Sequence, residues 1–77
     1  MDEKIKELTL LLLYLTSWKE KNGSEECLRS WKGYPFEILD ELIEDEYIKG
    51  SKTAKSVYLS EEGVKLAKEL ERKYLFH

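Results

Sequence analysis

Residues 35–46 read Pro35-Phe36-Glu37-Ile38-Leu39-Asp40-Glu41-Leu42-Ile43-Glu44-Asp45-Glu46, and the interpretation of the whole chain begins with this stretch. At ~100° per residue, an α-helix would place its apolar and acidic side chains on opposite sides. The apolar set is Phe36, Leu39, Leu42 and Ile43, and the acidic set is Glu37, Asp40, Glu41, Glu44 and Asp45. Proline at the first helical position sacrifices no hydrogen bond. The pattern therefore predicts an amphipathic helix with an acidic exposed face.

Two further helices are predicted before this one. In residues 3–18, the apolar side chains Ile5, Leu8, Leu11, Leu12, Leu15 and Trp18 recur at helical spacing, which predicts an inward-facing stripe. In residues 24–32, Ser24 is a plausible N-cap, and the inward side chains would be Cys27, Leu28 and Trp31. A tight Gly33-Tyr34 turn then leads into residues 35–46, which is the helix-turn-helix pattern.

The apolar period changes from helical to alternating after Glu46. Residues 47–49 and 56–59 alternate with a period of two around a polar loop, which predicts a β-hairpin. Ser60 then caps a helix over residues 60–75, whose apolar face carries Val64, Leu66, Ala67, Leu70 and Tyr74. The expected fold class is mainly α with a small β-hairpin. It is a winged helix-turn-helix with a three-helix core, a two-stranded wing and a C-terminal helix, in a single domain of residues 1–77.

Part of this pattern resembles a stretch of MarR-like and PadR-like bacterial regulators. The matching residues run from Leu39 to Ile48 and continue, after the hairpin, with Val57-Tyr58-Leu59-Ser60-Glu61-Glu62-Gly63. The whole chain, including Leu10–Tyr14 and Trp31-Lys32-Gly33-Tyr34, is similar to a family of short bacterial winged-helix-like proteins of unknown function. The resemblance implies a winged helix and dimerisation through terminal helices. The five carboxylates depart from the polar or basic recognition helices of the regulators.

The composition limits the classes of protein to consider. A net charge of −3 gives no overall attraction to nucleic acid or acidic membranes. The lone Cys27 permits no intramolecular disulfide, so we expect a small core residue in a reduced, cytoplasmic setting. The apolar run over residues 10–15 is too short to span a membrane. The first four residues lack a signal-peptide pattern.

A basic segment follows the acidic helix directly. Residues 34–48 carry a net charge of −6, whereas residues 49–56 carry +3. The candidate nucleic-acid contacts are Lys49, Lys52 and Lys55, with Arg29 and Lys32 as further candidates. Such contacts would reach phosphates without reading sequence, and the binding would be weak. The alternative is that the lysines only keep a hairpin tip soluble and protect an edge strand.

The acidic helix itself is the candidate protein-interaction surface. Its residues in that role are Glu37, Asp40, Glu41 and Glu44, and they would bind a basic partner. A phosphate surface would be repelled by the same face. The alternative is a solvated helix face with no partner.

A second apolar stripe on the first helix predicts a homodimer. Leu10, Leu13 and Tyr14 fall outside the inward stripe, and Leu75 adds apolar area near the other end of the chain. A small domain rarely leaves such a patch exposed. The alternative is that the first helix is buried on both sides within one subunit. Trp18 and Trp31 are expected in the core.

Catalysis has no support in the sequence, since the single histidine is His77 and no nucleophile lies near it. We therefore expect no enzyme, no cofactor and no metal site. Two functions stay open at this point. One is a nucleic-acid-associated or transcription-regulatory module with weak binding through the wing. The other is a homodimeric protein-interaction module that presents residues 35–46 to a basic partner.

Overall fold

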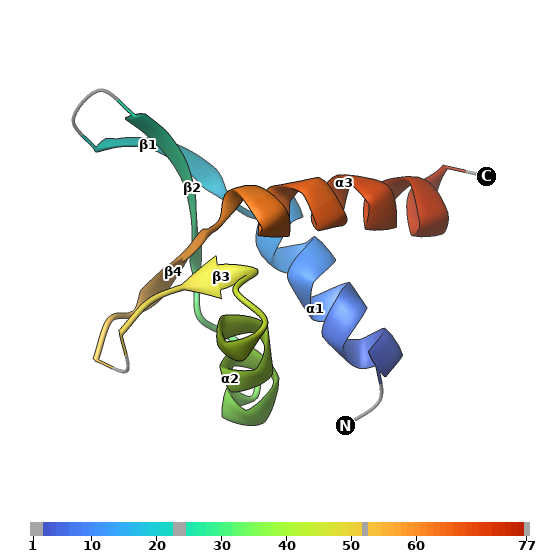
Figure 1. Cartoon of the computed structure of the whole chain (residues 1–77), viewed down its shortest axis with the longest axis horizontal. Helices are drawn as coiled ribbons and strands as arrows, with labels where there is room; N and C mark the ends of the chain where they lie inside the picture. Colours follow the sequence, from blue (N-terminus) through green and yellow to red (C-terminus); the bar gives the residue numbers. More distant parts are fainter. Residues whose placement is uncertain (1–2, 23–24, 52, 77) are drawn as a thin grey trace.

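The chain folds into three helices and a four-stranded antiparallel sheet in a computed structural model that describes residues 3–22, 25–51 and 53–76. The elements are α1 (Glu3–Leu15), β1 (Trp18–Asn22), β2 (Glu25–Trp31), α2 (Phe36–Glu44), β3 (Ile48–Lys49), β4 (Ser56–Leu59) and α3 (Glu61–Leu75). The strand order is β1-β2-β4-β3. In Figure 1 the β1–β2 hairpin extends away from the helices, and α3 crosses close to α1.

The core lies between the helices and one face of the sheet. The fully or nearly fully buried apolar side chains come from all three helices and from two of the strands. They include Leu10, Leu11 and Leu13 of α1, Ile38, Leu39 and Leu42 of α2, Ile48, Val57 and Leu59 of the sheet, and Ala67 and Leu70 of α3. Burial of this set is the main stabilising contribution to a domain of this size.

The second half of the chain follows the prediction closely. The acidic helix is α2, with Leu39 and Leu42 buried as expected, although Phe36 at its first turn is exposed. The predicted hairpin is β3 and β4, and the predicted last helix is α3. The expected Ser60 cap is present, because its hydroxyl accepts a hydrogen bond from the backbone N–H of Gly63 at 3.0 Å.

The predicted helix over residues 24–32 is wrong, because this segment is strand β2 and pairs with β1 on one side and β4 on the other. In β2, Leu28 and Ser30 belong to one face of the sheet and Arg29 and Trp31 to the other. Apolar and aromatic residues occur on both faces, which hides the period of two. The dipeptide Gly23-Ser24 between the two runs is a hairpin signal in the sequence that was read as a helix end and a helix cap.

The fold class is therefore broader than expected. Since a strand precedes α2, the described residues contain no helix-turn-helix pair, and α2 is not the second helix of such a motif. The expected two-stranded wing is one half of a four-stranded sheet. The result is an α+β arrangement in which the helices cover one face of an antiparallel sheet.

The rotation of α1 also differs from the prediction. The buried residues Leu10 and Leu13 are 0% exposed, whereas the expected inward stripe contributes mainly exposed side chains. The exposed ones are Ile5, Leu8, Leu12 and Leu15. Leu10 and Leu13 therefore belong to the core of this chain and are not available to a second copy. Leucines surround most of the helix circumference, so the spacing alone did not fix which side faces inward.

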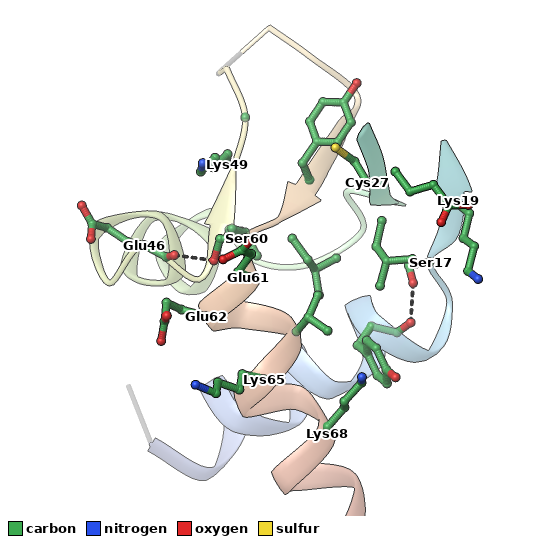
Figure 2. A pocket seen from close by; sticks show the side chains of 18 of the residues that line it. Ser17, Lys19, Cys27, Glu46, Lys49, Ser60, Glu61, Glu62, Lys65 and Lys68 are labelled. Carbon is green, nitrogen blue, oxygen red and sulfur yellow. Dashed lines mark hydrogen bonds between the residues drawn. The ribbon is translucent and has the colours of Figure 1, made fainter. Parts of the chain in front are cut away.

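The first turn of α3 is locked onto the entry to β3. The carbonyl of Tyr47 accepts a hydrogen bond from the backbone N–H of Ser60 at 3.0 Å, and the Ser60 hydroxyl also lies within 3.0 Å of this carbonyl. The same hydroxyl lies 2.6 Å from the carbonyl of Glu46, which has a positive φ of 64° (Figure 2). A Cβ on Gly63 would come within 1.9 Å of the Tyr47 oxygen, so only glycine fits at this position.

We expect Gly63→Ala to destabilise the fold by about 3 kcal/mol, because the added methyl group must displace backbone. The matched control is Gly33→Ala, where an added Cβ meets no atom within 4 Å. Urea denaturation of both variants measures the free energy of unfolding. Equal losses at the two glycines would contradict the close approach.

A hydrogen-bonded cluster joins α1 to the last turns of α3. The Glu7 carboxylate accepts hydrogen bonds from the Tyr74 hydroxyl at 2.9 Å and from Lys73 Nζ at 3.3 Å. The bond from Tyr74 is the main cause that lowers the pKa of Glu7, and Lys73 lowers this pKa further. Ionised Glu7 thus adds stability above its ordinary pKa of 4.5, and this stability is lost as the pH falls through the lowered pKa.

The variant Tyr74→Phe removes the main hydrogen bond to Glu7. We expect a lower melting temperature than wild type at pH 7, and a smaller difference once acid protonates Glu7. Tyr34→Phe is the control, since the Tyr34 hydroxyl makes no hydrogen bond with the described residues. Thermal unfolding between pH 2 and pH 7 measures the effect. A difference that stays constant over this range would show that the carboxylate is not involved.

Candidate functional site

The face of the sheet that points away from the helices carries a row of large polar and aromatic side chains. The strand register places Lys49 of β3 opposite Tyr58 of β4, Tyr58 opposite Arg29 of β2, and Arg29 opposite Trp18 of β1. One transverse row therefore crosses all four strands. Neither Trp18 nor Tyr58 belongs to the core cluster. We call this surface, together with Trp31, Glu20 and Ser56, the outer sheet face.

Arg29 occupies the centre of the outer sheet face in a fixed orientation. Its guanidinium donates from Nη1 to both carboxylate oxygens of Glu20 at 3.0 Å and from Nε to the Ser56 hydroxyl at 2.6 Å. It also lies 4.9 Å from the centre of the Tyr58 ring. The hydrogen bonds to Glu20 raise the pKa of Arg29 above its ordinary value, so the side chain stays charged. The result is a flat cationic group held by three neighbours.

The two tryptophans lie on this face, and the prediction that they belong to the core is wrong. Trp31 is 62% exposed and Trp18 is half-buried. Their ring centres are 5.1 Å apart with planes inclined by 45°, so each indole contacts the other across the β1–β2 pair. Trp31 thus presents a supported aromatic surface to solvent.

Two of the predicted basic residues, Lys49 and Arg29, belong to this row, and Lys32 and Lys55 lie at the end of the sheet beside the β3–β4 loop. Lys49 and Lys55 are exposed, and Lys32 Nζ donates to the carbonyl of Ser51 at 2.7 Å, which ties β2 to the β3–β4 loop. Lys32 follows Trp31 directly, and its backbone N–H bonds to the carbonyl of Lys55 at 3.0 Å. Lys52 lies outside the described residues. Arg29 already has its carboxylate partner.

The carboxylates of α2 are mostly exposed, as expected. Glu37, Asp40 and Glu44 face solvent. Glu41 lies 4.0 Å from Lys6 Nζ of α1, and Lys6 also donates a hydrogen bond to Asp45 that raises the lysine pKa. The acidic surface is thus partly neutralised on the side that faces α1.

A wide concavity lies where the β1–β2 hairpin and α3 diverge, and its lining includes Lys49 and Tyr58 of the outer sheet face (Figure 2). Apolar side chains such as Leu28 and Val64 line it, and charges of both signs surround it, among them Lys19, Lys65 and Glu61. Half-buried Cys27 of β2 also lines it, so the prediction that Cys27 belongs to the core is wrong. Within residues 3–22, 25–51 and 53–76, no group of three or more His, Cys, Asp or Glu side chains could hold a metal ion. The mixed charges favour no single class of ligand.

The sequence analysis missed most of the outer sheet face. The sequence pattern does not predict Glu20, Tyr58 and Ser56 as site residues, and it predicts Trp18 and Trp31 in the core. The available signal was the alternation of Arg29 and Trp31 with inward residues, which becomes visible once residues 25–31 are treated as a strand.

Fold and surface together describe a small two-layer α+β domain with one uncovered, aromatic sheet face. The chain belongs to a family described as a domain of unknown function, DUF6429, whose model matches residues 1–77. Comparisons with curated proteins and with solved structures gave no match. Within the part of the chain that the structure describes, no helix has the length and apolar character needed to cross a membrane.

Proposed function

We propose that this chain is a nucleic-acid-associated binding module that contacts phosphates through lysines beside the β3–β4 loop. The observation that carries the proposal is the position of Lys32, Lys49 and Lys55 at the end of the sheet beside the β3–β4 loop. None of the three makes an ion pair with a described residue, so their charges are available to phosphates. A transcription-regulatory role is one use of such a module.

Ser51 and Ala54 of the β3–β4 loop, beside these lysines, are held by hydrogen bonds without a ligand. Ser51 accepts from Lys32 through its carbonyl, and the same carbonyl lies 3.3 Å from the backbone N–H of Ala54. The Ser51 hydroxyl also accepts from this N–H at 3.2 Å. Less ordering of the loop is therefore needed on binding. Phosphate contacts of this kind position a nucleic acid without reading its sequence.

The acidic helix makes binding in the usual winged-helix manner unfavourable. In that manner the helix before the wing enters the major groove, where the exposed carboxylates of α2 would repel phosphates. We therefore propose that α2 stays away from the nucleic acid and that affinity is in the non-specific range, about 10⁻⁴–10⁻⁶ M at physiological salt.

The test of this proposal is a salt titration with Lys49→Glu/Lys55→Glu. We expect the double variant to lose nearly all binding to random-sequence nucleic acid, and the slope of log K against log salt concentration to fall by about two. The charge-matched control is Lys65→Glu/Lys68→Glu on α3, where both lysines are also exposed. Equal losses of affinity in both double variants would show that only the net charge of the protein matters, and would contradict a site at the loop.

The second candidate function is a protein-interaction module that binds a basic partner through α2. The observation in its favour is the exposure of Glu37, Asp40 and Glu44 along one helix. It predicts that a lysine-rich peptide binds the wild type and not Glu37→Gln/Asp40→Asn/Glu44→Gln. Peptide binding together with no nucleic-acid binding at low salt would favour this function over the first.

A homodimer through α1 stays part of this second proposal, on different residues. The exposed side chains Ile5, Leu8, Leu12 and Leu15 follow the 3-4-3 spacing of a short coiled-coil seam. Leu75 and Phe76 are also exposed, directly after Tyr74, which bonds to Glu7 beside this stripe. A second copy of the same stripe is the self-complementary partner that symmetric dimers use.

Light scattering on Leu8→Glu/Leu12→Glu checks the dimer. We expect a monomer for this variant and a concentration-dependent dimer for the wild type, because buried charges would oppose association. Phe36→Glu is the control, since it removes an exposed hydrophobic side chain from α2. A wild type that is monomeric at all concentrations would rule out the dimer and leave the lysine site unaffected.

A further inference from the structure

We propose that the outer sheet face binds single-stranded nucleic acid, with an unpaired base stacked on the exposed ring of Trp31. This inference rests on the proposed nucleic-acid function and names the substrate class for it. It is carried by the geometry of the sheet face, since the lysines alone would serve a duplex equally well.

The first feature that supports this ligand is the solvent exposure of Trp31. Its side chain is 62% exposed, although tryptophan, as a large aromatic residue, normally buries most of its surface. The Trp18 ring lies beside it, 5.1 Å away centre to centre, which limits the positions that the Trp31 ring can take. An indole ring is therefore exposed to solvent with an aromatic neighbour on one side. A planar, apolar ligand group would cover it with little loss of side-chain freedom.

The second supporting feature is the flat guanidinium of Arg29 beside the tryptophans. Arg29 is held by Glu20 and Ser56 and stacks over the ring of Tyr58. The guanidinium plane and aromatic rings are the groups on which proteins stack unpaired bases. Trp31 and Arg29 are on the same face of β2, two residues apart, so the exposed ring and the flat cation belong to one surface.

The third supporting feature is the excess of basic side chains around Trp31 and Arg29. Among the described side chains, the outer sheet face carries Arg29 and Lys49 against the single carboxylate of Glu20, and Lys32 and Lys55 lie at the end of the sheet beside the β3–β4 loop. That carboxylate is neutralised by Arg29 at 3.0 Å. Phosphates of a bound strand would thus meet lysines at the rim while bases meet the rings. A protein partner with an acidic surface would use only the lysines, and one with an apolar surface would use only the rings.

A duplex is excluded as the preferred ligand. In double-stranded nucleic acid the base faces are stacked on one another and cannot reach a ring on an open sheet. In a single strand every base offers a face, which makes such binding tolerant of sequence. Proteins with uncovered four-stranded sheets use exposed aromatic side chains in this way.

The experiment compares four probes: an oligothymidine strand, an oligoadenosine strand, a duplex of the two, and an abasic deoxyribose-phosphate strand of equal length. Quenching of the intrinsic tryptophan fluorescence and anisotropy of labelled strands report binding. We expect the wild type to bind either single strand at least fivefold more tightly than the abasic strand, and more tightly than the duplex.

The variant Trp31→Ala should lose roughly five- to 100-fold in affinity for the single strands. Its affinity for the abasic strand should not change, because the phosphate contacts remain. Trp31→Phe should retain most of the single-strand affinity. Phe36→Ala is the matched control, since Phe36 is an even more exposed aromatic side chain, on α2. Circular dichroism of each variant confirms that it is folded.

The outcomes separate this inference from the function on which it rests. Equal binding of duplex, abasic and single strands, unaffected by Trp31→Ala but abolished by Lys49→Glu/Lys55→Glu, would overturn the stacking site and leave the phosphate site standing. No binding of any strand at low salt would overturn both. A loss for Trp31→Ala that affects all four probes equally would also overturn stacking.

Discussion

The close approach of Gly63 to the carbonyl of Tyr47 determines how the two layers of this domain meet. It brings the first turn of α3 against the backbone that leads into β3, and Ser60 closes the contact by capping the helix and reaching back to the same turn. Glu46 turns there with a positive φ, so that the chain leaves α2 in the direction of the sheet. Since α3 also packs on α1 through Glu7 and Tyr74, one backbone contact positions three helices relative to the strands.

Because the helices occupy only one side of the sheet, the other side is left to the polar and aromatic residues of the strands. Ion pairing, cation–π contact and ring stacking there replace burial as the source of order. Such contacts contribute less stability than a packed helix layer would. A surface that is ordered yet uncovered is typical of binding sites, in which preorganisation lowers the entropy that a ligand must lose.

The sequence predicts the second half of the chain, from α2 to α3, because the apolar pattern there fits only one arrangement of helices and strands. Leu39 and Leu42 on α2, the Ile48–Leu59 pairing and the Ser60 cap each follow from local spacing. The first half failed for two reasons. Leucine on nearly every side of α1 leaves its rotation to tertiary packing. In β2, aromatic residues on the solvent face conceal the alternation, so Trp31 looked like a helical core residue. The candidate site lies in the half that failed, since exposed aromatic side chains both obscure a strand and build a binding surface.

Strand β1 forms one border of the sheet, and Lys19 and Lys21 on it are in register with Leu28 and Glu26, on the face nearer the helices. Another chain that tried to extend the sheet along this border would have to bring its own side chains against these two ammonium groups, of which only that of Lys21 has a carboxylate opposite, Glu26. Polymerisation by strand addition is therefore disfavoured, even though the neighbouring face exposes tryptophan. The two lysines thus oppose strand addition at the border of a sheet whose face exposes tryptophan.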